Sequence, residues 1–353
     1  MIKACFLTQK SARMSEMFRR NVPALPSLRK KLCSIFLMSC MGGVAFAGDY
    51  DNNEQVEAFI KEMVTEHQFE QDQLGQWFSQ VKRKQSILDA MSRPAEKVKP
   101  WSEYQDIFLT QSRIDKGVEF WKKHESVLAR AEKTYGVPAE IIVAIIGVET
   151  RYGGNKGRYR VMDALSTLAF DYPPRAPFFR KELKEFLLLS REQTRQPLDL
   201  LGSYAGAMGY GQFMPSSYRA YAADFDGDNA IDIWDNPVDA IGSVANYFTR
   251  HGWKTGELVT ERVKVNKSHD TSLLDDGLKP ERTIGEITQA GYAPLATLEG
   301  ELPARVFKLD GKKGAEFWVG LHNFYVITRY NRSTMYAMAV HQLSQSIKTK
   351  YQG

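Results

Sequence analysis

The organisation of this 353-residue chain is decided by the stretch Ala139-Glu140-Ile141-Ile142-Val143-Ala144-Ile145-Ile146-Gly147-Val148-Glu149. Its eight residues 141–148 are all apolar or glycine, which is typical of a helix buried on every side. Glu149 ends this run. Burial and the negative end of the helix dipole both destabilise a carboxylate, so we expect a raised pKa that suits a general acid. The alternative is a solvated helix-end glutamate that pairs with Arg151.

Helical patterning continues on both sides of this stretch. Upstream, apolar residues at helical spacing predict helices within residues 49–112 and over 117–135. Pro138 is suited to the first position of the buried helix. Downstream, the pattern stays helical to about residue 250 and becomes helical again over 333–348.

Residues 254–324 have a different pattern. Apolar and polar residues alternate over 262–265 and 305–309, and Asp310-Gly311 offers a turn before Phe317-Trp318-Val319. This predicts a small β subdomain. The fold class is therefore mainly α (α+β), a helical core with an N-terminal α domain and a small β subdomain. The predicted boundaries are 48–125, 126–253, 254–324 and 325–353.

The charge of the chain is concentrated in its first 47 residues. The whole sequence has 47 Lys and Arg against 42 Asp and Glu, a net charge of +5. Residues 1–47 contain eight of the basic residues and only one acid, so the remainder has 39 basic and 41 acidic residues. The part that folds carries no net basic charge, which excludes the usual basis for nucleic-acid binding.

The same 47 residues have the organisation of a secretory signal peptide. Arg29-Lys30-Lys31 precedes an apolar run over 32–44 and the small-residue site Ala45-Phe46-Ala47. The run is too short for a stable transmembrane helix. Cleavage after Ala47 predicts a periplasmic product. Two alternatives are a buried N-terminal helix and an outer-membrane lipoprotein, because Leu37-Met38-Ser39-Cys40 resembles a lipobox that would lipidate Cys40.

All three cysteines fall within this leader, at Cys5, Cys33 and Cys40. A product cut after Ala47 has none, which excludes a disulfide, a thiolate nucleophile and a cysteine-ligated metal. The six histidines show no metal-ligand spacing, so we expect no catalytic zinc.

A second informative block is rich in glycine and aromatic residues. It reads Gly202-Ser203-Tyr204-Ala205-Gly206-Ala207-Met208-Gly209-Tyr210-Gly211-Gln212-Phe213-Met214-Pro215. Dense glycines let the backbone approach a ligand closely, and tyrosine rings offer stacking faces. A tightly packed turn is the alternative, but it leaves Gln212 and the tyrosines unexplained.

A twelve-residue acidic loop over 224–235 has carboxylates at positions 1, 3, 5, 9 and 12. This is the spacing by which an EF-hand loop surrounds Ca²⁺. A structural Ca²⁺ (or Na⁺) is predicted to hold the start of a helix over 237–250. A solvated acidic loop is the alternative, although five unpaired carboxylates would repel one another. The predicted ligands are Asp224, Asp226, Asp228, the carbonyl of Ala230, and Asp235.

Three blocks together resemble one enzyme family. Gly147-Val148-Glu149-Thr150-Arg151-Tyr152-Gly153, the block 202–215, and Asn323-Phe324-Tyr325-Val326-Ile327-Thr328-Arg329-Tyr330-Asn331 are similar to the membrane-bound lytic murein transglycosylase B family. The resemblance extends over residues 101–345. It implies a lysozyme-like core that cleaves the β-1,4 bond between N-acetylmuramic acid and N-acetylglucosamine in peptidoglycan, leaving a 1,6-anhydromuramoyl end. It implies no catalytic cofactor and an EF-hand-like site.

The resemblance also implies roles for individual residues. Glu149 would be the single acid/base, assisted by the substrate's N-acetyl group. Ser203 would hold the glutamate and the acetamido group, and Gln212 would lie beside the cleavage point. Arg175 follows Pro174 where the family often has paired arginines, so contacts to distal sugars or peptide are less well supported. The groove residues are Tyr104, Tyr247, Tyr330, Tyr336 and Asn331.

The expected partners are peptidoglycan glycan strands and cell-wall synthesis or division proteins, with no nucleic acid and a monomeric chain. Two alternative functions stay open. A hydrolytic muramidase would need a second carboxylate to activate water, for which Asp163 and Asp171 are candidates. A non-catalytic peptidoglycan-binding scaffold would not need a desolvated acid, so Glu149, Ser203 and Gln212 speak against it.

Overall fold

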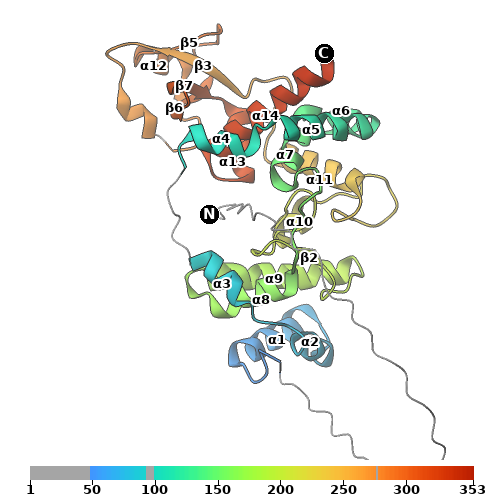
Figure 1. Cartoon of the computed structure of the whole chain (residues 1–353). Helices are drawn as coiled ribbons and strands as arrows, with labels where there is room; N and C mark the ends of the chain where they lie inside the picture. Colours follow the sequence, from blue (N-terminus) through green and yellow to red (C-terminus); the bar gives the residue numbers. More distant parts are fainter. Residues whose placement is uncertain (1–47, 93–98, 276) are drawn as a thin grey trace, which may run out of the picture. The chain divides into compact units, whose positions relative to one another are not determined.

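In the computed structural model, α7 (Ala139–Thr150) is the buried helix that its apolar sequence predicts (Figure 1). Residues 141–148 are all buried. The structure describes residues 48–92, 99–275 and 277–353. The predicted signal peptide and the lipidation of Cys40 lie outside these residues. None of the helices in the described part is long and apolar enough to cross a membrane.

Helices precede α7, as the sequence predicts. The segment predicted as one helix over 117–135 forms two, because the backbone leaves helical geometry at His124, where ψ is 25°. Pro138 lies just before the first residue of α7, one position earlier than expected. The six helices are α1 (Glu54–His67), α2 (Gln71–Phe78), α3 (Gln85–Ser92), α4 (Trp101–Phe108), α5 (Gln111–Lys123) and α6 (Glu125–Tyr135).

The helices after α7 complete the core around it. Helix α8 (Val161–Asp171) packs on α9 (Ala176–Glu192), and the C-terminal helix α14 (Thr334–Gln352) packs on α7 and α5. Short 3-10 helices cover Pro173–Arg175 and Thr271–Asp275. The remaining helices are α10 (Pro215–Tyr221), α11 (Pro237–Arg250), which matches the predicted 237–250, α12 (Ile284–Gln289) and α13 (His322–Tyr330).

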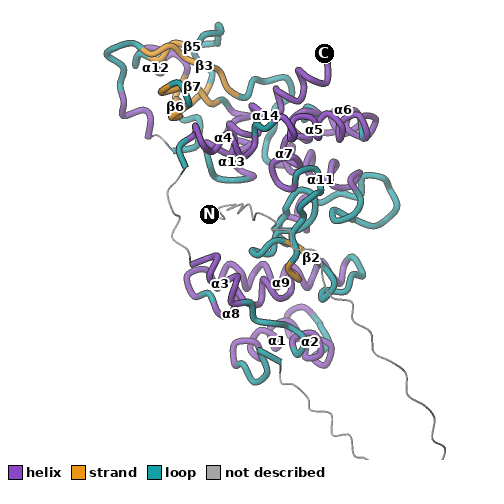
Figure 2. Tube along the Cα trace, viewed as in Figure 1, coloured by secondary structure: helices purple, strands orange, loops and turns teal. Residues whose placement is uncertain are grey.

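The predicted β subdomain is a five-stranded antiparallel sheet with α12 beside it (Figures 1 and 2). Its strand order is β4 (Arg282–Thr283), β6 (Pro303–Gly311), β7 (Gly314–Gly320), β3 (Thr260–Val265) and β5 (Tyr292–Pro294). A separate two-stranded sheet pairs β1 (Tyr159–Arg160) with β2 (Leu201–Gly202).

The turn between β6 and β7 lies two residues beyond the predicted Asp310-Gly311 position. Gly311 pairs with Gly314, so Lys312 and Lys313 form the turn. Gly314 has a φ of +114°, a conformation that favours glycine. Asp310-Gly311 therefore ends β6, and the prediction of a turn at these two residues is wrong.

Strand β6 is buried on both faces. Successive side chains of a strand point to opposite sides, and those of β6 enter two different cores. Val306 belongs to a small core within the subdomain, with Ile287 and Val319. The next residue, Phe307, belongs to the large helical core and stacks on Phe324 of α13, with ring centroids 4.9 Å apart. The sheet is therefore packed firmly against α13, the helix that ends at Tyr330 directly before Asn331, two of the predicted groove residues. The domain boundaries given above remain predictions.

Candidate active site

Glu149 is the penultimate residue of α7, and its carboxylate accepts a hydrogen bond from the Tyr336 hydroxyl at 2.5 Å. Burial raises the pKa of Glu149 to about 7, and the Tyr336 hydrogen bond partly opposes this rise. Arg151 is exposed and caps α7 in the left-handed region, with a φ of 53°. No ion pair joins it to Glu149 within the described residues. The structure therefore favours the desolvated carboxyl group over the solvated pair.

A buried arginine and a tyrosine hold the end of α7, and sequence analysis missed both. Arg113 is 6% exposed and donates to the carbonyls of Gly147 and Ile107. The Tyr152 hydroxyl donates to the Arg113 carbonyl at 2.8 Å. A Cβ on Gly147 would lie 2.6 Å from the Tyr152 ring, so glycine is required there. The hydrogen bonds from Arg113 to Gly147 and from Tyr152 to Arg113 join residues 34 and 39 positions apart, which explains why no local pattern indicated them.

Three of the predicted groove tyrosines lie in the electric field of Glu149. Burial raises the pKa of Tyr104 to about 12, and the charge of Glu149 adds to this rise. Burial and the same charge raise the pKa of Tyr330 and Tyr336 well above 10. All three hydroxyls therefore stay protonated and can donate hydrogen bonds at neutral pH. Tyr247 lies behind Tyr330, with ring centroids 4.7 Å apart.

The glycine-rich block forms a tight loop that is tied to two helices. The Thr150 hydroxyl donates to the Tyr210 carbonyl at 2.9 Å, which joins the loop to α7. The Tyr330 hydroxyl donates to the Gly211 carbonyl at 2.5 Å, which joins it to α13. Gln212 has a φ of 51°, an uncommon conformation for a residue other than glycine. Backbone strain of this kind is typical of ligand-binding loops.

The side chains of Ser203 and Gln212 form hydrogen bonds with nearby backbone groups. Ser203 Oγ accepts from the Ala207 amide at 3.0 Å. Gln212 Nε2 donates to the carbonyls of Lys156 and Gly209, at 3.2 and 3.1 Å. No hydrogen bond joins either side chain to Glu149 in the described part of the chain. Their expected contacts with substrate and with Glu149 remain predictions.

Asn331 and Arg175 occupy different surroundings. Asn331 directly follows α13 and is half-buried, and its carbonyl accepts from the Ser333 amide. Arg175 lies at the start of α9, with its guanidinium carbon 4.3 Å from the centre of the Phe178 ring. The structure places Arg175 against aromatic side chains in the first turn of α9, and its predicted substrate contact stays a prediction.

The two carboxylates that a muramidase could use have structural partners instead. Asp163 is 1% exposed, accepts from the Lys82 amide, and forms ion pairs with Arg160 and Lys84. Asp171 accepts from the Tyr50 hydroxyl at 2.6 Å and pairs with Arg83. Both groups attach the N-terminal helices to α8, so neither is free to activate water.

The acidic loop gathers a different set of carboxylates from the predicted one. Oxygens of Asp224, Asp226 and Asp239 lie within 4.8 Å of one another, which fits a hard cation such as Ca²⁺. Asp235 is 79% exposed and pairs with Lys156 at 3.0 Å, and the group of three carboxylates does not include it, so its role as a ligand stays a prediction. Asp239 lies in the first turn of α11, four residues beyond the end of the twelve-residue loop 224–235. That is why sequence analysis missed it.

The other predicted ligands of this loop are less well placed. Asp228 Oδ1 accepts from the Ala230 amide at 2.8 Å, and the group of three carboxylates does not include Asp228. Ala230 is exposed. Their roles as ligands stay predictions.

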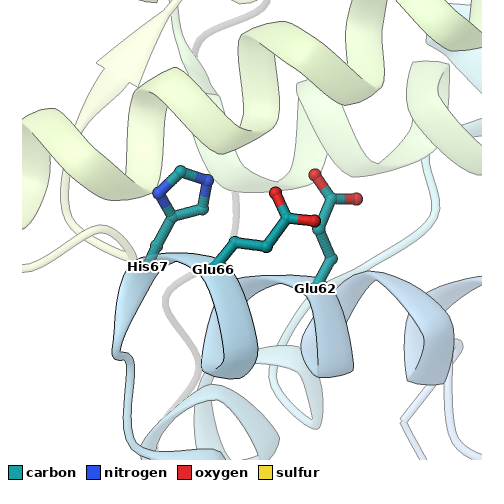
Figure 3. A group of neighbouring side chains, drawn as sticks. All are labelled: Glu62, Glu66 and His67. Atoms are coloured by element: carbon teal, nitrogen blue, oxygen red, sulfur yellow. The ribbon is translucent and has the colours of Figure 1, made fainter.

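A second group of possible ligands lies on α1, where Glu62, Glu66 and His67 point to the same side of the helix (Figure 3). The sequence analysis found no metal-ligand spacing around any histidine. Here Lys184 pairs with Glu62 at 3.0 Å and supplies the positive charge that a cation would bring. We assign no metal to this group.

Comparison with known proteins agrees with this arrangement. Residues 51–345 match the family model described as a transglycosylase SLT domain. The chain is 48% identical over 309 residues to membrane-bound lytic murein transglycosylase B of Escherichia coli (strain K12), covering 85% of this chain and 84% of that protein.

Two solved structures are also similar. A catenated lytic transglycosylase from Pseudomonas aeruginosa is 59% identical with a TM-score of 0.84, covering 86% of this chain and 100% of that one. A lytic transglycosylase of Escherichia coli, solved in complex with calcium, is 47% identical with a TM-score of 0.81, covering 87% and 96%. With a half-buried acid at the end of α7 and a match over most of its length, the chain belongs to the lytic murein transglycosylases of the SLT-domain family, enzymes that cleave peptidoglycan.

Proposed function

We propose that Glu149 alone supplies the acid and the base for cleavage of the bond between N-acetylmuramic acid and N-acetylglucosamine. The observation that carries this proposal is a half-buried carboxyl group with a pKa of about 7, held by the Tyr336 hydroxyl. Such a group is protonated in part of the molecules at neutral pH and can donate its proton.

In the first step, Glu149 gives its proton to the glycosidic oxygen as the bond from that oxygen to the anomeric carbon breaks. The carbonyl oxygen of the muramoyl N-acetyl group supports the anomeric carbon from the opposite face. In the second step, the Glu149 carboxylate removes the proton of the C6 hydroxyl while that oxygen bonds to the anomeric carbon. The product is the 1,6-anhydro sugar, and Glu149 is protonated again.

The surroundings of Glu149 support an intramolecular acceptor over water. The pKa of Glu149 is shifted by burial and by Tyr336, and no second carboxyl group of the described residues contributes to that shift. Asp163 is engaged in an ion pair with Lys84 and Asp171 in one with Arg83, both from the segment just before α3. A hydrolytic enzyme needs a carboxylate that activates water, and neither aspartate can do so while it keeps these partners.

We further propose that the acidic loop binds Ca²⁺ through Asp224, Asp226 and Asp239. The relative from Escherichia coli solved in complex with calcium supports this proposal, as does the proximity of the three carboxylates. The ion would neutralise their mutual repulsion and hold the start of α11. We also propose that the enzyme works in the periplasm, because the first 47 residues have the organisation of a signal peptide.

The test is mass spectrometry of the soluble products after residues 48–353 are incubated with purified peptidoglycan. We expect muropeptides that end in 1,6-anhydromuramic acid, and none with Glu149→Gln. Glu140→Gln is the matched control, because Glu140 lies on the same helix but pairs with Lys348. Reducing muramic acid ends would show that water is the acceptor and would refute the mechanism. Release by Glu149→Gln at the unmodified rate would refute the role of Glu149.

A further inference from the structure

A pocket of about 370 Å³ lies between α13 and the loop 277–281. Three residues of α13 line it, at positions 325, 328 and 329, together with Arg332, which lies two positions beyond the end of the helix. The spacing of three and one places the three helical residues on one face of α13. Pockets that hold small molecules are typically about 300 Å³ or larger, so this hollow can enclose part of a ligand.

The pocket is lined mainly by positive charge. Lys279, Arg329 and Arg332 contribute three cations, and Glu281 contributes one carboxylate. All four side chains are exposed, and no ion pair or side-chain hydrogen bond is found for any of them within the described residues. Three positive charges that line one pocket without partners repel one another. A bound anion would relieve this repulsion.

The pocket adjoins the proposed glycan site. Arg329 directly precedes Tyr330, and its carbonyl accepts from the Tyr247 hydroxyl at 2.7 Å. Arg332 directly follows Asn331. The side chains of these arginines therefore lie one residue away from positions that we expect to contact sugar rings.

We propose that this pocket binds the peptide stem of peptidoglycan through its free carboxylates, a proposal that rests on the proposed function. The glycan backbone carries no net charge once the lactyl carboxyl group of muramic acid is joined to the stem by an amide bond. The negative charge of the substrate is then on the peptide. Arginine guanidinium groups bind carboxylates through paired hydrogen bonds. Glu281 suits an amino group on the same peptide.

The decisive experiment compares two substrates: glycan strands that keep their stems, and the same strands after the carboxyl groups of the stems have been converted to amides. We expect Arg329→Gln/Arg332→Gln to lower kcat/KM on the strands with free stem carboxylates by about tenfold and to change it little on the amidated strands. The matched control is Lys313→Gln, which removes one exposed cation from the turn between β6 and β7 and should leave both values unchanged. Thermal melting verifies that each variant folds.

The outcomes are separable. Equal losses on the two substrates, or no loss on either, would overturn the pocket proposal and leave the proposed function intact. Absence of anhydro products with the unmodified enzyme on both substrates would instead overturn the proposed function.

A binding experiment identifies the recognised group directly. Free stem peptide is titrated into the enzyme by calorimetry, beside the same peptide with its carboxyl groups amidated and beside inorganic phosphate. We expect binding of the carboxylate form alone, lost in the double variant. Equal binding of the amidated peptide, or tighter binding of phosphate than of the peptide, would refute a carboxylate-specific site.

Discussion

Tyr336 and Glu149 form a pair in which each group affects the protonation of the other. Burial favours the neutral form of the carboxyl group, whereas the Tyr336 hydroxyl stabilises the anion. The balance leaves the pKa of Glu149 at about 7. One residue can then donate a proton in the first step and accept one in the second, because neither form is strongly disfavoured near neutral pH.

We expect Tyr336→Phe to raise the pKa of Glu149 further, because the hydrogen bond that lowers it is lost. The decline of kcat/KM above pH 7 should therefore move to higher pH. kcat should fall by about tenfold, because the carboxylate formed in the first step loses its donor. The measurement is the pH dependence of kcat/KM from pH 5 to 10.

Tyr330→Phe is the control for this shift, since the Tyr330 hydroxyl donates to Gly211 and not to Glu149. If the decline of kcat/KM at high pH does not move in Tyr336→Phe, the hydrogen bond from Tyr336 does not set the pKa of Glu149.

The raised pKa also has a consequence for stability. Between pH 4.5 and 7 the folded protein keeps the Glu149 proton that the unfolded chain releases, so stability falls as the pH rises through this range. Glu149→Gln removes this loss of stability, because glutamine does not ionise. At pH 8 we expect the variant to be more stable than the unmodified protein by up to about 3 kcal/mol, with no gain at pH 4. Urea unfolding at both pH values measures the difference, and an equal effect at the two would contradict the assignment.

At the level of elements, the acidic loop is closed by a residue of the helix that follows it. Asp239 is fully buried in α11 and accepts from the amides of Phe225 and Asp232, both at 2.8 Å. These two bonds fasten both sides of the loop to the helix. A cation held by Asp224, Asp226 and Asp239 would therefore join the loop to α11 through a rigid ligand.

Calcium should raise the melting temperature of the enzyme by several degrees, because an ion at 100 times its Kd stabilises the folded state by about 2.7 kcal/mol. We expect Asp239→Asn to abolish this rise and Asp235→Asn to retain it. Asp235 is the matched control, since it pairs with Lys156. Each variant is compared with itself, with and without calcium, by scanning calorimetry. If calcium no longer raised the melting temperature of Asp235→Asn but still raised that of Asp239→Asn, the ligands would be those of the twelve-residue loop that ends at Asp235.

Over the whole molecule, ion pairs at α8 attach the N-terminal helices to the core. Asp163 contacts the Lys82 amide and the side chain of Lys84, and Asp171 contacts Tyr50 and Arg83. The partners of these aspartates come from segments about eighty or more residues earlier in the chain. The attachment of the N-terminal helices therefore depends on the carboxylates of Asp163 and Asp171. A muramidase mechanism would instead require one of these carboxylates to be free to activate water.

We expect Asp163→Asn to destabilise the protein by about 3 kcal/mol, because it leaves the charges of Arg160 and Lys84 without their buried partner. The products should still end in 1,6-anhydromuramic acid. Urea unfolding and mass spectrometry of the products check the two parts. Asp171 is 25% exposed, so Asp171→Asn should cost less. A change from anhydro to reducing ends in Asp163→Asn would revive the hydrolytic alternative.

The sequence alone determined the features that depend on neighbouring residues. The apolar run 141–148 predicted a helix buried on all sides, and it placed Glu149 at an apolar helix end. The boundaries of α11 and the existence of the β subdomain followed in the same way from local periodicity. Motifs spread over residues 101–345 indicated the family.

Only the tertiary structure decided which distant groups meet. It brought Asp239 beside Asp224 and Asp226 in the acidic loop, paired Asp163 and Asp171 with Lys84 and Arg83, and brought Arg113 to the end of α7. It also brought Lys279 to the face of α13 that carries Arg329. Each of these contacts joins residues from separate elements. Periodicity reports which face of an element is buried, but the partner of that face is set by how the elements pack together.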